Sequence, residues 1–228
     1  MIDGTFFISS ALNVKQLSVF TNEERYQQTV NTVKSIDKYC SNSVKYMFDS
    51  SYKMPDARYI QGIQNLGVNF LWTGWNDQVQ KLSDQGHRSL AETLGFILFL
   101  NSYAQAPVVC KRIYKLSGRY ELNDDFILDR EDFKDSFVFS KIWDSWMSEE
   151  QQERVGIKNM IALRLWHMDA SLFDIFNKEL SNILELMIKS NIDVEHAYYK
   201  ILSKYKIAIC GPIGVSGVIA PTGEIINE

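Results

Sequence analysis

Short β-rich hydrophobic runs alternate with amphipathic helical segments through the first half of the chain. The runs predict strands over Thr5–Ser10, Val44–Phe48, Val68–Leu71 and Ile113–Leu116. Between the first two runs, Thr21 and Glu24 match a capping box, and apolar residues then recur at helical spacing as far as Tyr39. A strand, a helix and a second strand in this order predict a parallel pair joined by a crossover connection.

The same alternation continues to the end of the chain. It predicts helices over Pro55–Ile63, Asp77–Leu82, Ser89–Tyr103 and Ser171–Ile188, a last helix capped by Asp193, and strands over Phe137–Phe139, Met160–His167, Ile207–Cys210 and Val218–Ala220. No repeat or interdomain linker interrupts the pattern. We therefore expect residues 1–228 to form a single domain, an α/β fold with a mixed, mostly parallel sheet flanked by helices.

The composition is that of an ordinary packed protein. Hydrophobic residues make up 46% of the chain, which suffices for one sizeable core. The net charge of −4 provides no overall basic field and argues against nucleic acid as a partner. The three cysteines form no metal-binding pair, and neither a basic signal segment nor an apolar run of membrane-spanning length is present. These features predict a cytoplasmic protein whose anion site, if it has one, is local.

The segment Arg112–Phe126 has the pattern of such a local site. The carboxyl end of its predicted strand presents the cations and hydroxyls of Lys115, Ser117, Arg119 and Tyr120 around Gly118. In open α/β sheets this end of a strand is where ligands bind, and cations beside a glycine suit phosphate. An ordinary turn with surface cations is an equally good interpretation. After the turn, Asn123 or Asp124 is a plausible cap for a helix leading into Phe126.

A second candidate anion site precedes the helix that begins at Ser89. Ser89 and Glu92 match a capping box, and His87 and Arg88 lie just ahead of it. Unpaired backbone amides and the helix dipole attract anions to such a terminus, although a capped helix with exposed cations explains the same residues. Phosphate-binding loops, dinucleotide fingerprints and the motifs of zinc proteases and α/β-hydrolases are all missing from the sequence.

Several of these segments together resemble the nucleotide-sugar glycosyltransferases of the GT-A type, in particular small proteins of bacterial and phage surface-polysaccharide biosynthesis. The similar stretches are ISSALN, VNTVKSI leading into KYMFDSS, HRSLAETLGF, IYKLSGRYELNDDF, VEHAYYKIL and GVSGVIAPTGEIINE. The resemblance implies a Rossmann-like GT-A fold that moves a sugar from a nucleotide-diphosphate sugar to a hydroxyl acceptor. It also implies that the ends of the first two strands, with Ser9, Ser10, Asp49 and Ser50, hold the nucleoside.

The sequence departs from this family at the metal site. In the family, a D-x-D motif at the fourth strand holds a divalent cation, whereas Ser117, Gly118 and Arg119 occupy that position here. A hard cation has then lost its oxygen ligands. The resemblance implies a metal-independent variant that requires no cofactor, in which Lys115 and Arg119 offset the charge of the leaving group. Alternatively, Asp124 and Asp125 bind Mn²⁺ or Mg²⁺.

Two pairs of residues are candidates for the catalytic base. If the transfer inverts the anomeric carbon, a carboxylate or an imidazole must take the acceptor proton. Glu195 with His196 is the first pair and Asp169 with His167 the second. Ordinary structural roles explain each residue equally well, since an acidic residue near a helix start suits the dipole.

Two other classes of function remain open at this point. The chain is alternatively a non-catalytic module that binds a nucleotide sugar or a glycan, or an interaction protein that associates through the region from Trp143 to Trp146. Turnover of a nucleotide sugar separates the first two classes, and a failure to bind any nucleotide favours the third. A resemblance of fold does not choose among them.

Overall fold

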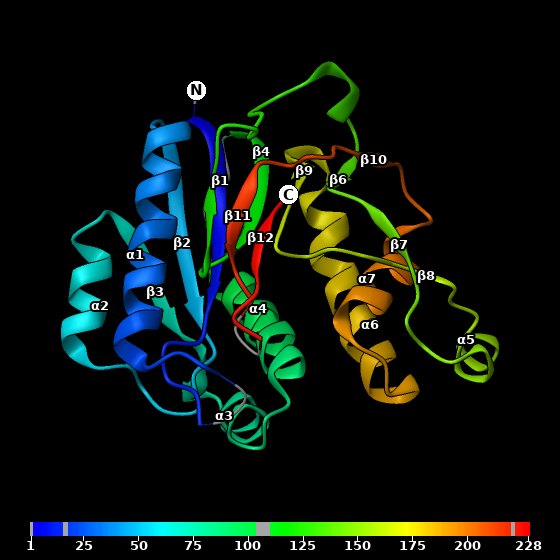
Figure 1. Cartoon of the computed structure of the whole chain (residues 1–228), viewed down its shortest axis with the longest axis horizontal. Coiled ribbons are helices and arrows are strands. Elements are labelled where there is room, and N and C mark those ends of the chain that lie inside the picture. The colour runs from blue at the N-terminus through cyan, green and yellow to red at the C-terminus, as the bar shows by residue number, and fades with distance from the viewer. Residues whose placement is uncertain (1, 16–17, 104–109, 220–221) are drawn as a thin grey trace.

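A seven-stranded sheet in the order β10-β6-β9-β4-β1-β2-β3 forms the centre of the computed structural model (Figure 1), which describes residues 2–15, 18–103, 110–219 and 222–228. The strands are β1 (Ile2–Ser10), β2 (Ser43–Asp49), β3 (Val68–Trp72), β4 (Cys110–Ser117), β6 (Phe137–Phe139), β9 (Leu165–Asp169) and β10 (Ile207–Ile209). All neighbouring strands are parallel except β9, which is antiparallel to both β4 and β6. The predicted mixed, mostly parallel sheet is confirmed.

Helices cover both faces of this sheet. They are α1 (Asn22–Tyr39), α2 (Ala57–Gln64), α3 (Asp77–Asp84), α4 (Arg88–Tyr103), α5 (Glu149–Val155), α6 (Phe173–Ser190) and α7 (Val194–Leu202), with short 3-10 turns at Thr73–Trp75, Glu131–Phe133 and Ala170–Leu172. Residues of α1 and α2 share one hydrophobic cluster with the sheet, and residues of α4, α6 and α7 share the other. None of the helices in the described ranges has the length and apolar character that crossing a membrane requires.

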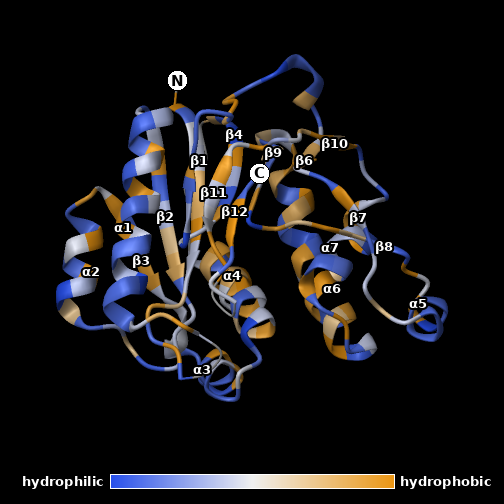
Figure 2. Cartoon of the chain, viewed as in Figure 1, coloured by the Kyte–Doolittle hydropathy of each residue, from blue (hydrophilic) through white to orange (hydrophobic). Residues whose placement is uncertain are grey.

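The alternation of side chains along β1 explains the two clusters. Phe6 and Ile8 point to the side of α1, whereas Phe7 points to the side of α4, and all three are buried. A strand that is apolar on both faces must lie between two layers of helices. Figure 2 shows the hydrophobic residues gathered on the strands and on the helix sides that meet them.

Two small sheets complete the fold. Strands β5 (Tyr120–Leu122), β11 (Val215–Val218) and β12 (Ile225–Asn227) form one of them, and β7 (Ile142–Asp144) and β8 (Asn159–Ile161) form the other. In Figure 1, β11 and β12 lie in front of the centre of the main sheet, and β7 and β8 lie on the side of α5, α6 and α7. Ala220, the end of a predicted strand, lies outside the described residues.

The capping pattern at Thr21 is confirmed. The Thr21 hydroxyl accepts the backbone N–H of Glu24, and the Glu24 carboxylate accepts the backbone N–H of Thr21. Asp193 likewise accepts the N–H of His196 at the start of α7. These bonds satisfy amides that a helix end leaves unpaired. Both patterns are local, so sequence spacing alone identifies them.

The helix predicted after Asn123 is wrong. The chain turns back at Gly118 into β5, and the Asn123 side chain accepts the N–H of Asp125 in a tight turn. Asn and Asp stabilise turns by the same hydrogen bonds that cap helices. Met160–His167 is also not one strand, because residues 162–164 separate β8 from β9.

The capping box predicted at Ser89 is also wrong. Helix α4 already begins at Arg88, which places Ser89 inside its first turn. The Glu92 carboxylate accepts a hydrogen bond from the Lys115 ammonium, 2.6 Å away on β4. Glu92 therefore belongs to the space between α4 and the sheet, where the candidate site lies.

Candidate functional site

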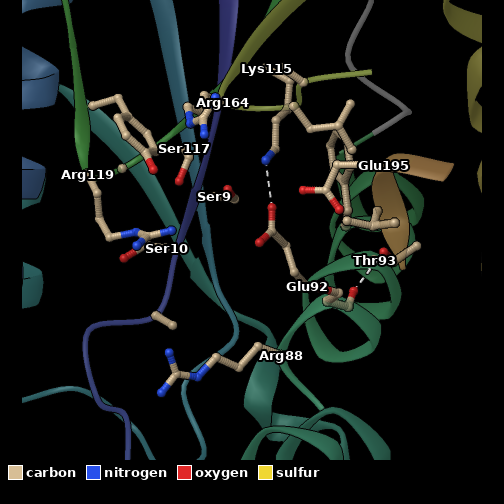
Figure 3. Close-up of a pocket in the computed structure, with 18 of the residues that line it drawn as sticks. Ser9, Ser10, Arg88, Glu92, Thr93, Lys115, Ser117, Arg119, Arg164 and Glu195 are labelled. Carbon is tan, nitrogen blue, oxygen red and sulfur yellow. Dashed lines mark hydrogen bonds and ion pairs between the residues drawn. The ribbon is translucent and has the colours of Figure 1, made fainter. Parts of the chain in front are cut away.

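A cavity of about 440 Å³ lies beyond the carboxyl ends of β1 and β4. Ser9 on β1 is in register with Ser117 on β4, so the two predicted strand ends lie side by side. The cavity is lined by nine of the ten residues predicted to bind the nucleotide sugar, namely Ser9, Ser10, Ser50, Arg88, Lys115, Ser117, Gly118, Arg119 and Tyr120. Figure 3 shows the side chains of Arg88, Lys115 and Arg119 around this space.

The turn after β4 is fastened to β1. The N–H of Gly118 donates to the carbonyl of Ser9 at 2.8 Å, and the Thr29 hydroxyl on α1 donates to the carbonyl of Gly118. A Cβ at position 118 would lie 3.1 Å from the Ser9 carbonyl oxygen. The glycine thus allows close contact between backbone segments, and this contact holds Arg119 at the cavity.

Four arginines line the cavity. Arg164 is paired with Glu228, and the other three guanidinium groups come from Arg25 on α1, Arg88 on α4 and Arg119. Burial, together with the charges of Arg119 and Arg88, lowers the pKa of Arg25 to about 10. Burial and Arg119 also lower the pKa of Arg88. Like charges held together in a partly desolvated space create a strong local positive field. The site is therefore suited to an anion with several negative charges.

Lys115 and Glu92 form an ion pair inside the cavity. The Lys115 side chain is buried, and its ammonium lies 2.6 Å from the carboxylate of Glu92. Burial raises the pKa of Glu92, but Lys115 and, further away, Arg119 lower it more, so its pKa lies below the ordinary value. Glu92 consequently stays ionised at neutral pH and offsets the charge of Lys115. The anion attraction then comes mainly from the three arginines.

Glu195 projects into the same cavity from the first turn of α7. Burial raises the pKa of its carboxyl to about 7, and the charges of Asp193 and Glu92 act in the same direction. A carboxyl group with this pKa exchanges protons readily at neutral pH. Figure 3 shows Glu195 on the side of the cavity where Lys115 and Glu92 lie.

The prediction that His196 acts as a base is corrected. Its ring is fully buried and does not line the cavity. Its Nδ1 is hydrogen-bonded to the Asp193 carboxylate and its Nε2 to the Ser145 hydroxyl, each at 2.7 Å. With both nitrogens engaged, the imidazole holds the loop of Ser145 against α7.

The predicted role of Asp49 is also corrected. Its side chain is fully buried, and its two carboxylate oxygens accept the backbone N–H groups of Leu12 and Ser51. Asp49 thus joins the segments that follow β1 and β2 and leaves Ser50 at the cavity. It supports the backbone beside the cavity and does not itself line the cavity.

The second candidate pair lies elsewhere. The Asp169 carboxylate accepts the N–H groups of Ser171 and Asp135, beside Arg112. The His167 ring is buried between Tyr114 and Phe133. Neither residue lines the cavity, so the pair is not positioned to act on a ligand there.

His167 instead makes the fold sensitive to acid. Burial, helped by the charge of Arg112, lowers the pKa of its imidazole from 6.5 to about 3. Below pH 6.5 the imidazole of the unfolded chain takes up a proton, whereas the imidazole of the folded protein stays neutral until about pH 3. The free energy of unfolding is therefore unaffected by the titration of His167 above pH 6.5 and falls as the pH is lowered from there. We expect a loss of about 2 kcal/mol at pH 5. Urea unfolding of His167→Phe at pH 7.5 and pH 5 should show a smaller loss, whereas the exposed His87→Gln control should match wild type. Equal losses in all three would contradict this.

The alternative metal ligands are also outside the cavity. Asp124 is exposed and interacts with Lys38 and with the Tyr39 hydroxyl, while Asp125 lies in the turn after β5. Within the described ranges, no three His, Cys, Asp or Glu side chains are grouped as metal ligands. In the cavity itself, the Glu92 carboxylate is bound to Lys115, Glu195 is the only other acidic residue of the lining among the described residues, and four arginines line the same space. This donor set does not fit a divalent metal.

Three charged residues that line the cavity were not predicted from the sequence to belong to the site. Arg25 lies in a helix, Glu92 matched a cap, and Arg164, which is paired with Glu228, lies between two strands. Arg25, Thr29 and Thr32 follow at helical spacing and are all buried, which marks a polar stripe beside the apolar one. This polar stripe was the one feature of the sequence that could have indicated Arg25 as a site residue. The spacing of the residues, however, does not show which part of the protein the stripe faces.

Comparison with protein-family models and with curated proteins gives no match. Among solved structures, the chain is similar to the galactosyltransferase LgtC in complex with donor and acceptor sugar analogues, with a TM-score of 0.60 and 9% identity over 96% of this chain and 88% of that one. It is also similar to core-mannan synthase A from Aspergillus fumigatus in its Mn/GDP form, with a TM-score of 0.51 and 9% identity over 89% and 70%. The mannosyltransferase Ktr4p from S. cerevisiae is similar with a TM-score of 0.51 and 8% identity, over 88% of this chain and 65% of that one. The fold is that of GT-A glycosyltransferases.

Proposed function

We propose that this protein transfers a sugar from a nucleoside-diphosphate sugar to an acceptor hydroxyl in glycan biosynthesis, without a divalent metal. The observation that carries the proposal is the meeting of Arg25, Arg88 and Arg119 with Glu195 in one cavity. Its volume of about 440 Å³ lies in the range of roughly 300 to 1,000 Å³ that small-molecule sites occupy. The GT-A fold supports the same activity by analogy only.

The arginines would bind the diphosphate. Guanidinium groups match phosphate oxygens in geometry and charge, and they stabilise the additional charge that develops as the sugar leaves. This is the task that a metal ion performs where one is present. Burial and the neighbouring arginine charges lower the pKa values of Arg25 and Arg88, and the repulsion between these charges would be relieved when the ligand binds. Ser9, Ser10 and Ser50 offer hydroxyls to the nucleoside part.

The two carboxylates would have different roles. In the transfer, the bond between the anomeric carbon and the diphosphate oxygen breaks, a bond to the acceptor oxygen forms, and the acceptor proton passes to Glu195. The Glu195 pKa of about 7 suits this exchange. Glu92, kept ionised by Lys115, would stabilise the positive charge that develops on the sugar ring. Environments that separate the pKa values of two carboxyl groups are typical of acid and base assignments.

A thermal-shift screen tests the proposal. UDP, GDP, CMP, dTDP and their sugars are each added in EDTA and in manganese to wild type, Arg119→Ala and the control Arg154→Ala, an exposed residue of α5. A ligand that binds only the folded protein raises its melting temperature. We expect one nucleotide to raise it in EDTA, with an affinity about tenfold lower in Arg119→Ala and unchanged in Arg154→Ala.

The other outcomes discriminate among the alternatives. A shift seen only with manganese would contradict the metal-free mechanism. Binding of a nucleotide sugar without any transfer or hydrolysis would favour a binding module. No shift with any nucleotide would contradict the proposed function and favour an interaction protein.

A further inference from the structure

Two exposed indole rings line the cavity on the side of β7, β8 and α7. The Trp143 side chain on β7 is 38% exposed and the Trp146 side chain after it is 64% exposed. Both border the same space as Glu195. Large aromatic side chains left exposed around one cavity are typical of surfaces that a ligand or partner covers.

The position of the Trp146 ring is fixed by the residue next to Glu195, while the Lys141 ammonium lies 5.3 Å from the centroid of the Trp143 ring. The Trp146 ring meets the His196 ring edge to face, with centroids 5.2 Å apart and planes at 87°. His196 is itself held between Asp193 and Ser145. The Ser145 hydroxyl also accepts the N–H of Met147, which follows Trp146. The loop of Trp146 is thus attached to the same turn of α7 that presents Glu195.

Charge divides the cavity into two parts. The arginines Arg25, Arg88 and Arg119 come from α1, α4 and the turn after β4, whereas the indole part carries Glu195 and apolar side chains. The remaining charged residues that line the cavity are paired, Lys115 with Glu92 and Arg164 with Glu228. The apolar residues that line the cavity on β8 and just after it are Met160, Ala162 and Leu163. Glu195 disfavours a phosphate in this part, and apolar walls disfavour a charged group generally. The occupant is therefore an uncharged group with an apolar face.

A pyranose ring has these properties. One face of the ring carries C–H groups that pack on an indole, and its edge carries hydroxyls that hydrogen-bond to a carboxylate. We propose that Trp143 and Trp146 form the acceptor subsite, which binds an uncharged hexopyranose of a glycan and directs one of its hydroxyls to Glu195. This inference rests on the proposed function, because it assigns the nucleotide to the arginine part of the cavity.

Binding of simple pyranosides tests the inference. The probes are methyl glucopyranoside, methyl galactopyranoside and methyl mannopyranoside, measured by saturation-transfer NMR with a saturating concentration of the nucleotide identified in the screen. We expect one of them to bind wild type and to bind Trp146→Ala about tenfold more weakly. Trp146→Tyr should restore most of the affinity, since an aromatic face remains. Nucleotide affinity should be unchanged in both variants.

Trp75→Ala is the matched control. Trp75 is 54% exposed, but it does not line the cavity, so its loss should change neither ligand. Three outcomes would overturn the inference while leaving the proposed function intact. In the first, no probe binds although the nucleotide does, and in the second, Trp146→Ala binds the probe as well as Trp75→Ala does. In the third, Trp146→Ala loses nucleotide affinity, which would place the nucleobase on the indole rings. A wild-type dimer that dissociates only in Trp146→Ala, seen by size-exclusion chromatography, would also overturn it in favour of a second copy as occupant. Failure of every nucleotide to bind would instead remove the proposed function.

Discussion

Glu195→Gln should reduce the rate of sugar transfer by about 10²- to 10⁴-fold, the range that a general base contributes. The amide has nearly the shape of the carboxyl group but cannot take the acceptor proton. Because the donor diphosphate is assigned to the arginines, its affinity should be unchanged in the variant. The measurement is kcat and the donor affinity for wild type and Glu195→Gln with the nucleotide sugar identified in the screen.

The pH dependence provides an independent check of this role. The pKa of Glu195 is about 7, mainly through burial, and a base acts in its deprotonated form. Activity of wild type should therefore rise with pH through a midpoint near pH 7, and the residual activity of Glu195→Gln should lack this rise. Glu185→Gln, at an exposed position of α6, is the control and should keep the wild-type profile. A Glu195→Gln enzyme with the wild-type rate would exclude Glu195 as the base.

The elements of the fold were largely predictable because their signals are local. The capping box at Thr21, the apolar stripe of α6 and the doubly buried run of β1 each depend on residues close together in sequence. The prediction failed after β4, where Asn123 stabilises a turn and not a helix. Whether the chain forms a turn or a helix at this point depends on the pairing of β5 with β11, which lies almost a hundred residues later. A local sequence pattern does not predict such a pairing.

The candidate site was predictable where it consists of strand ends. Parallel strands place their carboxyl ends at one edge of a sheet, so the residues after β1 and β4 had to meet. The direction of each side chain was not predictable. Asp49 and His196 have the chemistry of site residues, but the structure uses them to fasten backbone segments. Glu92 has the spacing of a cap but meets Lys115 across the cavity.

Arg25 is the clearest case in which the proposed function and stability oppose each other. The side chain is almost completely buried, and its Nε has no hydrogen-bond partner among the described residues. Burial and the charges of Arg119 and Arg88 lower its pKa to about 10. A lowered pKa means that the folded protein destabilises the charged form relative to the unfolded chain. The charge of Asp49 offsets only part of this effect, so the buried cation is a cost that a bound diphosphate removes.

Arg25→Met should for this reason stabilise the unliganded protein and weaken ligand binding. Methionine fills a similar volume without charge, so we expect the free energy of unfolding in urea to rise by about 1–2 kcal/mol. The affinity for the nucleoside diphosphate should fall about 10²-fold, because a buried hydrogen-bonded charge pair is lost. Arg154→Met, at an exposed position of α5, should change neither quantity. A variant that is less stable and retains wild-type affinity would show that Arg25 supports the packing of α1 and does not bind the ligand.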